Sequence, residues 1–146
     1  MYVIRQVMIL KIMVCGSIGY GNIDELKKFY GILKNNGFDV LDHLSQCGMD
    51  YSVIKDFREK KDLASKIVRH DMEFIAKADV IVVLANFPSY GAAIEMEIAK
   101  KSGKKVILYA PKPVPTPWPV EFSDFVAKNQ AELFDILRKL DSDKNS

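Results

Sequence analysis

The sequence feature that most restricts the fold is the run from Val80 to Ala85, which reads VIVVLA. The run carries no charge, and most of its side chains are branched at Cβ. A short, continuously apolar run of this kind is typical of a strand that is buried on both faces. Such strands occur at the centre of parallel sheets that helices cover on both sides. We therefore expect Val80–Ala85 to form an inner strand of a parallel sheet.

Other segments alternate with this run as a parallel α/β sheet requires. Further strands are expected at Leu10–Cys15, Phe38–Leu41 and Lys105–Tyr109. The spacing of apolar residues predicts helices at residues 23–35, 62–77, 91–102 and 129–140. Residues 42–61 are polar and irregular, and a short helix is expected near 51–60. This alternation predicts a doubly wound, flavodoxin- or Rossmann-like α/β fold, with four to five parallel strands in a single domain over residues 1–146. In such sheets the ligand lies beyond the carboxyl ends of the strands.

The two ends of the chain and one proline-rich stretch should lie outside this pattern. Residues 1–7 form a possible ragged extension, and residues 141–146 a frayed polar tail. Proline occupies every second position from Pro111 to Pro119. Because proline has no backbone N–H, we expect this stretch to be extended.

Composition excludes several classes of partner. The net charge is only +2, and the basic residues are scattered along the predicted helices, which argues against a nucleic-acid polymer. The apolar N-terminus is interrupted by Arg5 and Lys11 and is too short to cross a membrane. Cys15 and Cys47 lack metal-ligand spacing, and reduced thiols are typical of a cytoplasmic protein. The sequence therefore predicts a cytoplasmic protein without a membrane partner.

Two carboxylates fall on the apolar faces of predicted helices. Asp71 lies one turn after Ile67 and one turn before Ile75, and Glu95 lies one turn after Gly91. Because burial of an unpartnered carboxylate is costly, such positions indicate a functional site. Two structural explanations stay open. Asp71 could cap a local break or pair with a lysine, and Glu95 could match the positive end of its helix dipole.

Two inward carboxylates suit the cleavage of a glycosidic bond. One can attack or stabilise an anomeric carbon with oxocarbenium character, while the other protonates the leaving group. The same logic applies to N-glycosides, in which the leaving group is a nucleobase. The pair therefore predicts chemistry on a nucleoside or nucleotide that needs neither a metal nor a redox cofactor.

The loop after the first strand is a candidate substrate-binding segment. The backbone amides and serine hydroxyl of Gly16-Ser17-Ile18-Gly19 could cradle a phosphate or a ribose hydroxyl. Its glycine spacing does not match the dinucleotide pattern G-x-G-x-x-G, and no Walker lysine follows. Ser89 and Gly91 form a second small-residue loop at a helix start, which is equally able to bind an anion.

Four short motifs occur in a characteristic order along the chain. They are Cys15-Gly-Ser-Ile18, then Asp71 with Ala78-Asp-Val-Ile-Val-Val83, then Pro88-Ser-Tyr-Gly-Ala-Ala-Ile-Glu95 and Ala99-Lys-Lys-Ser-Gly-Lys-Lys-Val-Ile107. In order and spacing they resemble the nucleoside 2-deoxyribosyltransferase family. The resemblance covers roughly residues 9–110 and is closest to the branch of 2′-deoxynucleoside 5′-phosphate N-hydrolases.

The resemblance implies a role for each matching residue. Glu95 corresponds to the nucleophile that attacks the anomeric carbon, and Asp71 to the acidic residue that assists the leaving base. The positions that hold the 5′-phosphate in the hydrolase branch correspond to Gly16, Ser17, Ser89 and Gly91. The resemblance also implies a small-molecule nucleoside or nucleotide substrate. It further implies a homodimer or larger homo-oligomer in which a neighbouring subunit completes the site.

Three functions are therefore considered. The first is an N-glycosidase that cleaves 2′-deoxynucleoside 5′-monophosphates to a free base and deoxyribose 5-phosphate. The second is base exchange, in which another nucleobase accepts the sugar after the same first half-reaction. The third is a nucleotide-binding module with little or no turnover, because this chain has Met13 where the family usually has a tyrosine. The chain also has Gly19 and Tyr20 where the hydrolase branch tends to carry an arginine.

Overall fold

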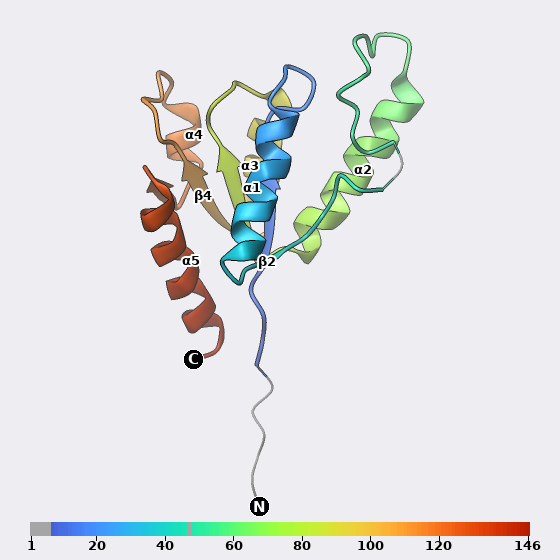
Figure 1. The fold of residues 1–146 in the computed structure, drawn as a ribbon. Helices are drawn as coiled ribbons and strands as arrows, with labels where there is room; N and C mark the ends of the chain where they lie inside the picture. The colour runs from blue at the N-terminus through green and yellow to red at the C-terminus, as the bar shows by residue number, and fades with distance from the viewer. Residues whose placement is uncertain (1–6, 47) are drawn as a thin grey trace, which may run out of the picture.

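The computed structural model describes residues 7–46 and 48–146, so residues 1–6 of the possible N-terminal extension lie outside the described residues. Strands and helices alternate along the described chain (Figure 1). The strands are β1 (Lys11–Cys15), β2 (Asp39–Val40), β3 (Val80–Leu84), β4 (Lys105–Tyr109) and β5 (Phe125–Ala127). The helices are α1 (Ile23–Asn35), α2 (Lys61–Lys77), α3 (Tyr90–Lys101), α4 (Trp118–Glu121) and α5 (Gln130–Lys144).

The five strands of the described chain form one sheet in the order β2-β1-β3-β4-β5, and every neighbouring pair is parallel. The β1–β3 register runs from Ile12 beside Val80 to Cys15 beside Val83. The chain adds β2 on one side of β1 and β3 on the other, so the winding direction reverses between β1 and β3. The predicted doubly wound parallel sheet is confirmed, and its switch point lies at the carboxyl ends of these two strands.

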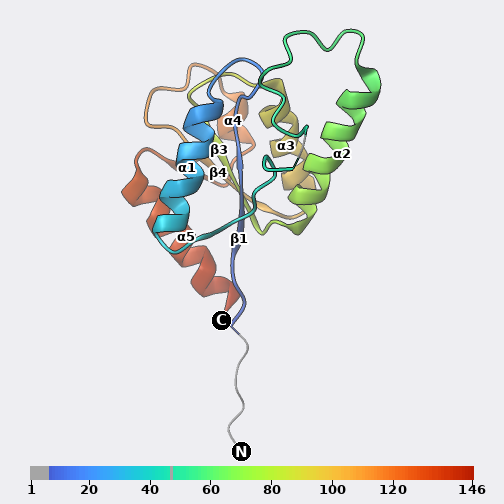
Figure 2. The same cartoon turned by 45° about the vertical axis from the view of Figure 1, so that its right-hand side comes forward.

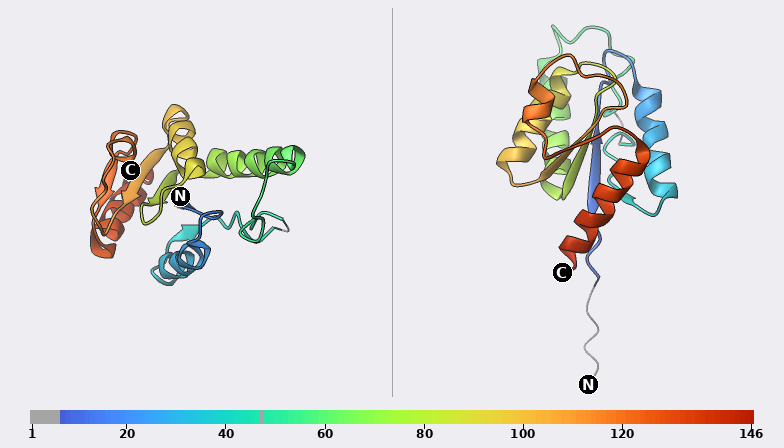
Figure 3. Two further views of the ribbon diagram at one scale, coloured as in Figure 1. Left: turned by 90° about the horizontal axis from the view of Figure 1, so that it is seen from above. Right: turned by 90° about the vertical axis from the view of Figure 1, so that its left-hand side faces the viewer.

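Helices cover both faces of the sheet. α1 and α5 pack on one face, and α2, α3 and α4 lie on the other (Figures 2 and 3). Side chains alternate between the two faces along a strand. Ile12 and Val14 of β1 accordingly belong to the core under α1 and α5, whereas Met13 and Cys15 belong to the core under α2 and α3. The last side chain of β1 is therefore directed toward the α2–α3 layer.

The helices that follow β1 and β3 are each followed by a glycine just after the C-cap, but they begin in different ways. Ser89 caps α3, because its Oγ accepts a hydrogen bond of 3.1 Å from the Ala92 N–H. Asn22 stands at the N-cap of α1, but it has a φ of 79° and makes no capping side-chain hydrogen bond. The Asn22 carbonyl accepts from the Leu26 N–H at 3.0 Å, which is the first backbone bond of the helix. Gly37, after α1, has a φ of 85°, as expected for a helix stop.

The short helix expected near residues 51–60 was predicted wrongly, because this segment forms turns. Asp50 accepts hydrogen bonds from the backbone N–H and the hydroxyl of Ser52. Asp56 likewise accepts bonds from the backbone and the guanidinium of Arg58. Local side-chain bonds of this kind compete with helical hydrogen bonding, which explains the difference.

Two segments near the C-terminus are more helical than the sequence indicates. α4 begins at Trp118 inside the stretch expected to be extended, and Pro119 is tolerated there because a helix start has no use for its missing N–H. α5 continues to Lys144 instead of fraying after residue 140. Nζ of Lys144 lies 2.6 Å from Oδ2 of Asp79 and donates to the Ile9 carbonyl at 3.0 Å. These contacts fasten the end of α5 to the amino ends of β1 and β3.

Candidate active site

Glu95 lies on α3, the helix that begins just beyond the carboxyl end of β3. Its side chain is partly buried and leans toward the start of the helix. A methyl group added to Gly91 would lie 3.6 Å from Oε1 of Glu95, so this oxygen rests against the first turn of α3. Burial and the nearby charge of Asp71 raise the pKa of Glu95 to about 8.

The other oxygen of this carboxylate is held by β1. The thiol of Cys15 donates a hydrogen bond of 3.2 Å to Oε2 of Glu95. Cys15 is buried, and burial together with the Glu95 carboxylate raises the pKa of the thiol well above its ordinary value. The thiol therefore stays protonated at neutral pH and keeps the hydrogen that it donates.

Asp71 lies on α2, which packs against α3. Ile67 and Ile75, one turn to either side, are buried, and Asp71 is partly buried between them. Burial raises the pKa of Asp71 to about 6. Within the described residues Asp71 forms no ion pair with a lysine, so the structural explanation left open by the sequence finds no support there.

The two carboxylates influence each other's ionisation. The negative charge of Asp71 contributes to the raised pKa of Glu95. With pKa values of about 6 for Asp71 and about 8 for Glu95, the pair holds a single proton in the neutral range. A pair that shares one proton can supply a nucleophile or base and an acid in the same site.

The first loop, predicted as a substrate-binding segment, divides into parts with different environments. Ser17 is buried, and its Oγ has no hydrogen-bond partner within residues 7–46 and 48–146. Because an unsatisfied buried hydroxyl is costly, Ser17 is well placed to bind a polar group of a ligand. The side chain of Ile18 packs into the core beneath α1, so only its backbone is available. Gly19 is exposed, and Gly16 is buried beside Leu84.

The second loop lies next to the first. The rings of Tyr20 and Tyr90 are 6.3 Å apart, which places the two segments side by side at the carboxyl end of the sheet. Ser89 uses its oxygen as acceptor for the cap of α3 and keeps its hydroxyl hydrogen to donate. Gly91 is exposed in the first turn of the helix, where backbone N–H groups lack intrahelical partners.

Tyr51 belongs to this region although the sequence does not reveal it. Burial, followed by the charges of Glu95 and Asp71, raises the pKa of Tyr51 to about 12. A methyl group added to Gly19 would lie 3.8 Å from Cε2 of the same ring. Tyr51 therefore connects the first loop with the carboxylates. Its segment has no helical or strand periodicity, so no sequence signal marks it.

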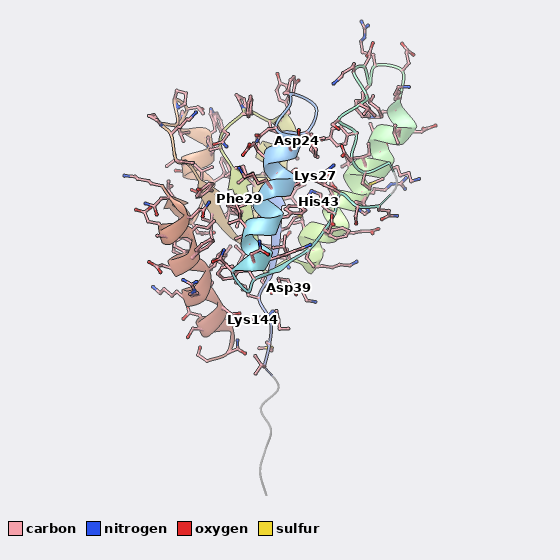
Figure 4. All side chains as sticks on the ribbon, viewed as in Figure 1. Asp24, Lys27, Phe29, Asp39, His43 and Lys144 are labelled. Carbon is pink, nitrogen blue, oxygen red and sulfur yellow. The ribbon has the colours of Figure 1, made fainter. Side chains whose placement is uncertain are left out.

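The two histidines have structural partners. His43 is buried between α1 and α2, and its Nδ1 lies 2.6 Å from the hydroxyl of Tyr30 (Figure 4). Burial lowers the pKa of His43 to about 4, so it is neutral at physiological pH. Nε2 of His70 lies 3.0 Å from the His43 carbonyl, and its ring packs on Phe74. This network joins α2 to α1 and supports the helix that carries Asp71.

The depressions found on the surface of the described chain lie away from Glu95 and Asp71. Two open depressions of about 590 and 650 Å³ lie elsewhere, and neither is lined by Glu95 or Asp71. Among the described residues no group of three or more histidine, cysteine, aspartate or glutamate side chains is arranged to hold a metal ion. None of the helices described here is long and apolar enough to cross a membrane.

A parallel sheet with two partly buried carboxylates near its switch point is an arrangement that suits an α/β enzyme acting on glycosidic bonds. The particular family follows from comparison of the sequence. The model of the nucleoside 2-deoxyribosyltransferase family matches residues 14–135, so the chain belongs to this family. Enzymes of this family act on the N-glycosidic bond of small nucleosides or nucleotides. The predicted family is thus confirmed.

Solved structures that share the fold include the following two. A 2-deoxyribosyltransferase from Bacillus psychrosaccharolyticus superposes with a TM-score of 0.63 and 18% identity, covering 87% of this chain and 95% of that one. The CMP N-glycosidase BcmB of Clostridium botulinum superposes with a TM-score of 0.50 and 19% identity, covering 90% of this chain and 98% of that one. Comparison with curated protein sequences gives no match.

Proposed function

We propose that this protein is an N-glycosidase that cleaves the base–sugar bond of 2′-deoxynucleoside 5′-monophosphates, with Glu95 as the nucleophile. The observation that carries the proposal is the electrostatically coupled pair of Glu95 and Asp71 at the switch point of the sheet. Family membership supports chemistry at the N-glycosidic bond. The solved N-glycosidase with the same fold supports hydrolysis as one outcome of that chemistry.

The proposed reaction proceeds in two steps. The higher pKa of Glu95 places the shared proton mainly on Glu95, so the reaction proceeds from the minor form of the pair in which Asp71 holds it. In that form an oxygen of the ionised Glu95 carboxylate bonds to C1′ as the C1′–N bond breaks, and Asp71 gives its proton to the departing base. Water then attacks C1′ and releases Glu95, while the Asp71 carboxylate accepts a proton from that water. The products are the free base and deoxyribose 5-phosphate, and both carboxyl groups return to their starting protonation states.

The phosphate would bind between the two loops. Ser17 offers a buried hydroxyl without a partner among the described residues, and Ser89 keeps one hydroxyl hydrogen to donate. The start of α3 at Gly91 adds free backbone N–H groups and the positive end of the helix dipole. These features favour a substrate with an anionic group at this end of the site.

Base exchange is the second candidate, because the matching family model and one of the solved structures are deoxyribosyltransferases. In that case a second nucleobase, rather than water, would attack the glycosyl–Glu95 intermediate. Met13, where the family usually has a tyrosine, is fully buried in the apolar core and cannot supply a phenol. A site limited by this substitution would bind a nucleotide and turn it over slowly or not at all.

We further propose that the protein is a homodimer or larger homo-oligomer. Val68 and Met72 on α2, which packs against α3, expose 54% and 45% of their surface, and Ile94 on α3 exposes 60%. A second subunit on these helices would cover apolar surface close to the carboxylates. Size-exclusion chromatography with light scattering tests this proposal, and a strictly monomeric mass at assay concentration would contradict it.

The function is tested by a base-release assay with liquid chromatography. The purified protein is incubated with the four deoxynucleoside monophosphates, the matching ribonucleotides and the unphosphorylated deoxynucleosides, each with and without an added free base. Release only from phosphorylated deoxy substrates, lost in Glu95→Ala and in Glu95→Gln, is the expected result. A new nucleotide formed with the added base would instead indicate exchange. Full turnover in both Glu95 variants would eliminate the proposed mechanism.

A further inference from the structure

The contact between Cys15 and Glu95 joins two elements that the chain places far apart. Cys15 is the last residue of β1 and Glu95 lies in the second turn of α3, 80 positions later in the chain. The thiol is buried, so the bond is shielded from competing water. Among the described residues the thiol is the only side chain that hydrogen-bonds to this carboxylate.

The two oxygens of the Glu95 carboxylate therefore have different environments. Oε2 accepts the thiol hydrogen of Cys15, whereas Oε1 lies against Gly91 at the start of α3. An oxygen that already accepts a hydrogen bond is a weaker nucleophile than its free partner. The contact thus fixes the rotation of the carboxylate and leaves Oε1 as the oxygen that faces the loop of Ser89.

We propose that Cys15 is a positioning residue for the nucleophile: its S–H···O hydrogen bond to Oε2 orients the Glu95 carboxylate, stabilises its ionised form and leaves Oε1 to attack the sugar. This inference rests on the proposed function, because it assigns Oε1 to the attack on C1′. It concerns a residue of the strand, not a group that touches the substrate.

The electrostatic surroundings of Glu95 agree with this role. Burial and the charge of Asp71 raise its pKa, and the bond from Cys15 acts in the opposite direction. Tyr51 from the segment before α2 and Tyr30 from α1 are the other titratable groups that feel the Glu95 charge, and burial raises the pKa of each. At neutral pH both phenols are uncharged, and among the described residues neither of them hydrogen-bonds to the carboxylate, which accepts from the Cys15 thiol.

The test compares Cys15→Ala, which removes the donor, with Cys15→Ser, which keeps a donor of similar size. The direct readout is the pKa of Glu95, followed by carbon NMR of protein labelled at the glutamate carboxyl and assigned with Glu95→Gln. We expect Cys15→Ala to raise this pKa by about half a unit to one unit, because a thiol is a weak donor. At pH values below the pKa, such a shift lowers the ionised fraction of Glu95 about 3- to 10-fold. Cys15→Ser should keep the pKa at or below the wild-type value.

Val14→Ala serves as the control for truncation on the same strand, because the Val14 side chain packs into the core on the other face of the sheet. It should lower thermal stability and leave the pKa of Glu95 unchanged. In the base-release assay, Cys15→Ala should lower kcat with little effect on KM and move upward the limb of the pH profile near pH 8, which follows the pKa of Glu95. Cys15→Ser should restore both.

The NMR readout separates this inference from the proposed function. A wild-type protein that releases no base from any substrate would refute the function, yet the NMR comparison would still measure the effect of Cys15. An active enzyme whose Glu95 pKa and kcat profile are unchanged in a folded Cys15→Ala variant would overturn the positioning role. A shift of equal size in Val14→Ala would overturn it as well, because the effect would then reflect general loosening of β1.

Discussion

At the scale of single residues, the proposed mechanism makes activity depend on the proton shared by Asp71 and Glu95. Below about pH 6 both carboxyl groups are protonated and no nucleophile is available. Above about pH 8 both are ionised and no acid remains to protonate the base. We therefore predict a bell-shaped dependence of kcat/KM on pH, with its maximum between these values, measured by base release at constant ionic strength.

The Asp71→Asn variant is the control for this pH profile. The loss of the alkaline limb in Asp71→Asn would assign that limb to ionisation of the acid. A profile that keeps rising beyond pH 9 in the wild-type protein would contradict the shared-proton description.

Asp71→Asn also tests the role of Asp71 in the departure of the base. An amide has no proton to donate at neutral pH, and general acid catalysis typically contributes about 10²- to 10⁴-fold. We expect the rate to fall most for bases that leave poorly, and least for substrates whose leaving base needs no proton. The measurement is kcat for a series of deoxynucleotides with different leaving bases. Equal slowing across the series would show that Asp71 acts in some other way.

The environment of these residues was only partly predictable from sequence. Helical spacing places Asp71 and Glu95 on inward faces, and the structure finds both partly buried. Cys15 and Tyr51 were missed as neighbours of Glu95. A cysteine at the end of an apolar strand looks like any core residue, and Tyr51 lies in a segment without periodicity. Contacts of this kind join residues far apart in the sequence and depend on the tertiary packing of the elements, which no local pattern encodes.

At the scale of elements, the start of α3 combines a structural cap with a proposed binding role. Ser89→Ala removes the acceptor for the Ala92 N–H and should cost about 1 kcal/mol of stability, as loss of an N-cap typically does. If Ser89 also donates to the phosphate, KM for deoxynucleotides should rise several-fold, while KM for unphosphorylated substrates stays the same. Urea denaturation and base-release kinetics measure the two effects separately.

Asn129→Ala provides the matched control. Asn129 caps α5 through the same kind of bond, with its side chain accepting from the Glu132 N–H at 2.8 Å. It should lose a comparable amount of stability without any change in KM. A similar rise of KM in both variants would mean that the effect of Ser89 is structural alone.

The elements themselves were well predicted where apolar periodicity is strong. The four predicted strands and the four longer helices are found with small shifts of their ends. The errors fall where side chains act locally or at long range. Asp50 and Asp56 bind their own neighbours and keep residues 51–60 from forming a helix. Lys144 extends α5 because Asp79, distant in sequence, holds it.

At the scale of the whole molecule, the two ends of the sheet have different tasks. The amino ends of β1 and β3 are fastened by the ion pair of Lys144 with Asp79 and by the hydrogen bond from the Lys11 N–H to Asp79. The carboxyl ends carry Cys15 and the loops, and face the partly buried pair of Glu95 and Asp71. We therefore expect the contacts of Asp79 at the amino ends to stabilise the fold, and the partly buried carboxylates at the carboxyl ends to destabilise it.

Glu95→Gln tests this division through the pH dependence of stability. Burial raises the pKa of Glu95 from its ordinary value of 4.5 to about 8 in the folded protein. Between these pH values the folded protein holds a proton that the unfolded chain has lost, so the free energy of unfolding falls as the pH rises. Glutamine does not titrate. We therefore expect Glu95→Gln to gain stability relative to wild type between pH 5 and pH 8, on the order of 2 kcal/mol once partial exposure is taken into account.

The matched control is Glu97→Gln, two residues along the same helix. Glu97 is half-exposed and pairs with Lys101 at 2.9 Å, and a surface pair of this kind contributes about 0 to 1 kcal/mol. Urea denaturation of the three proteins at pH 5 and pH 8 makes the comparison. We expect the free energy of unfolding to rise in Glu95→Gln but not in Glu97→Gln, and base release to be lost only in Glu95→Gln. This result would show that the buried Glu95 carboxylate destabilises the fold and is required for the reaction. An equal change in the free energy of unfolding in both variants would mean that the Glu95 carboxylate does not destabilise the fold.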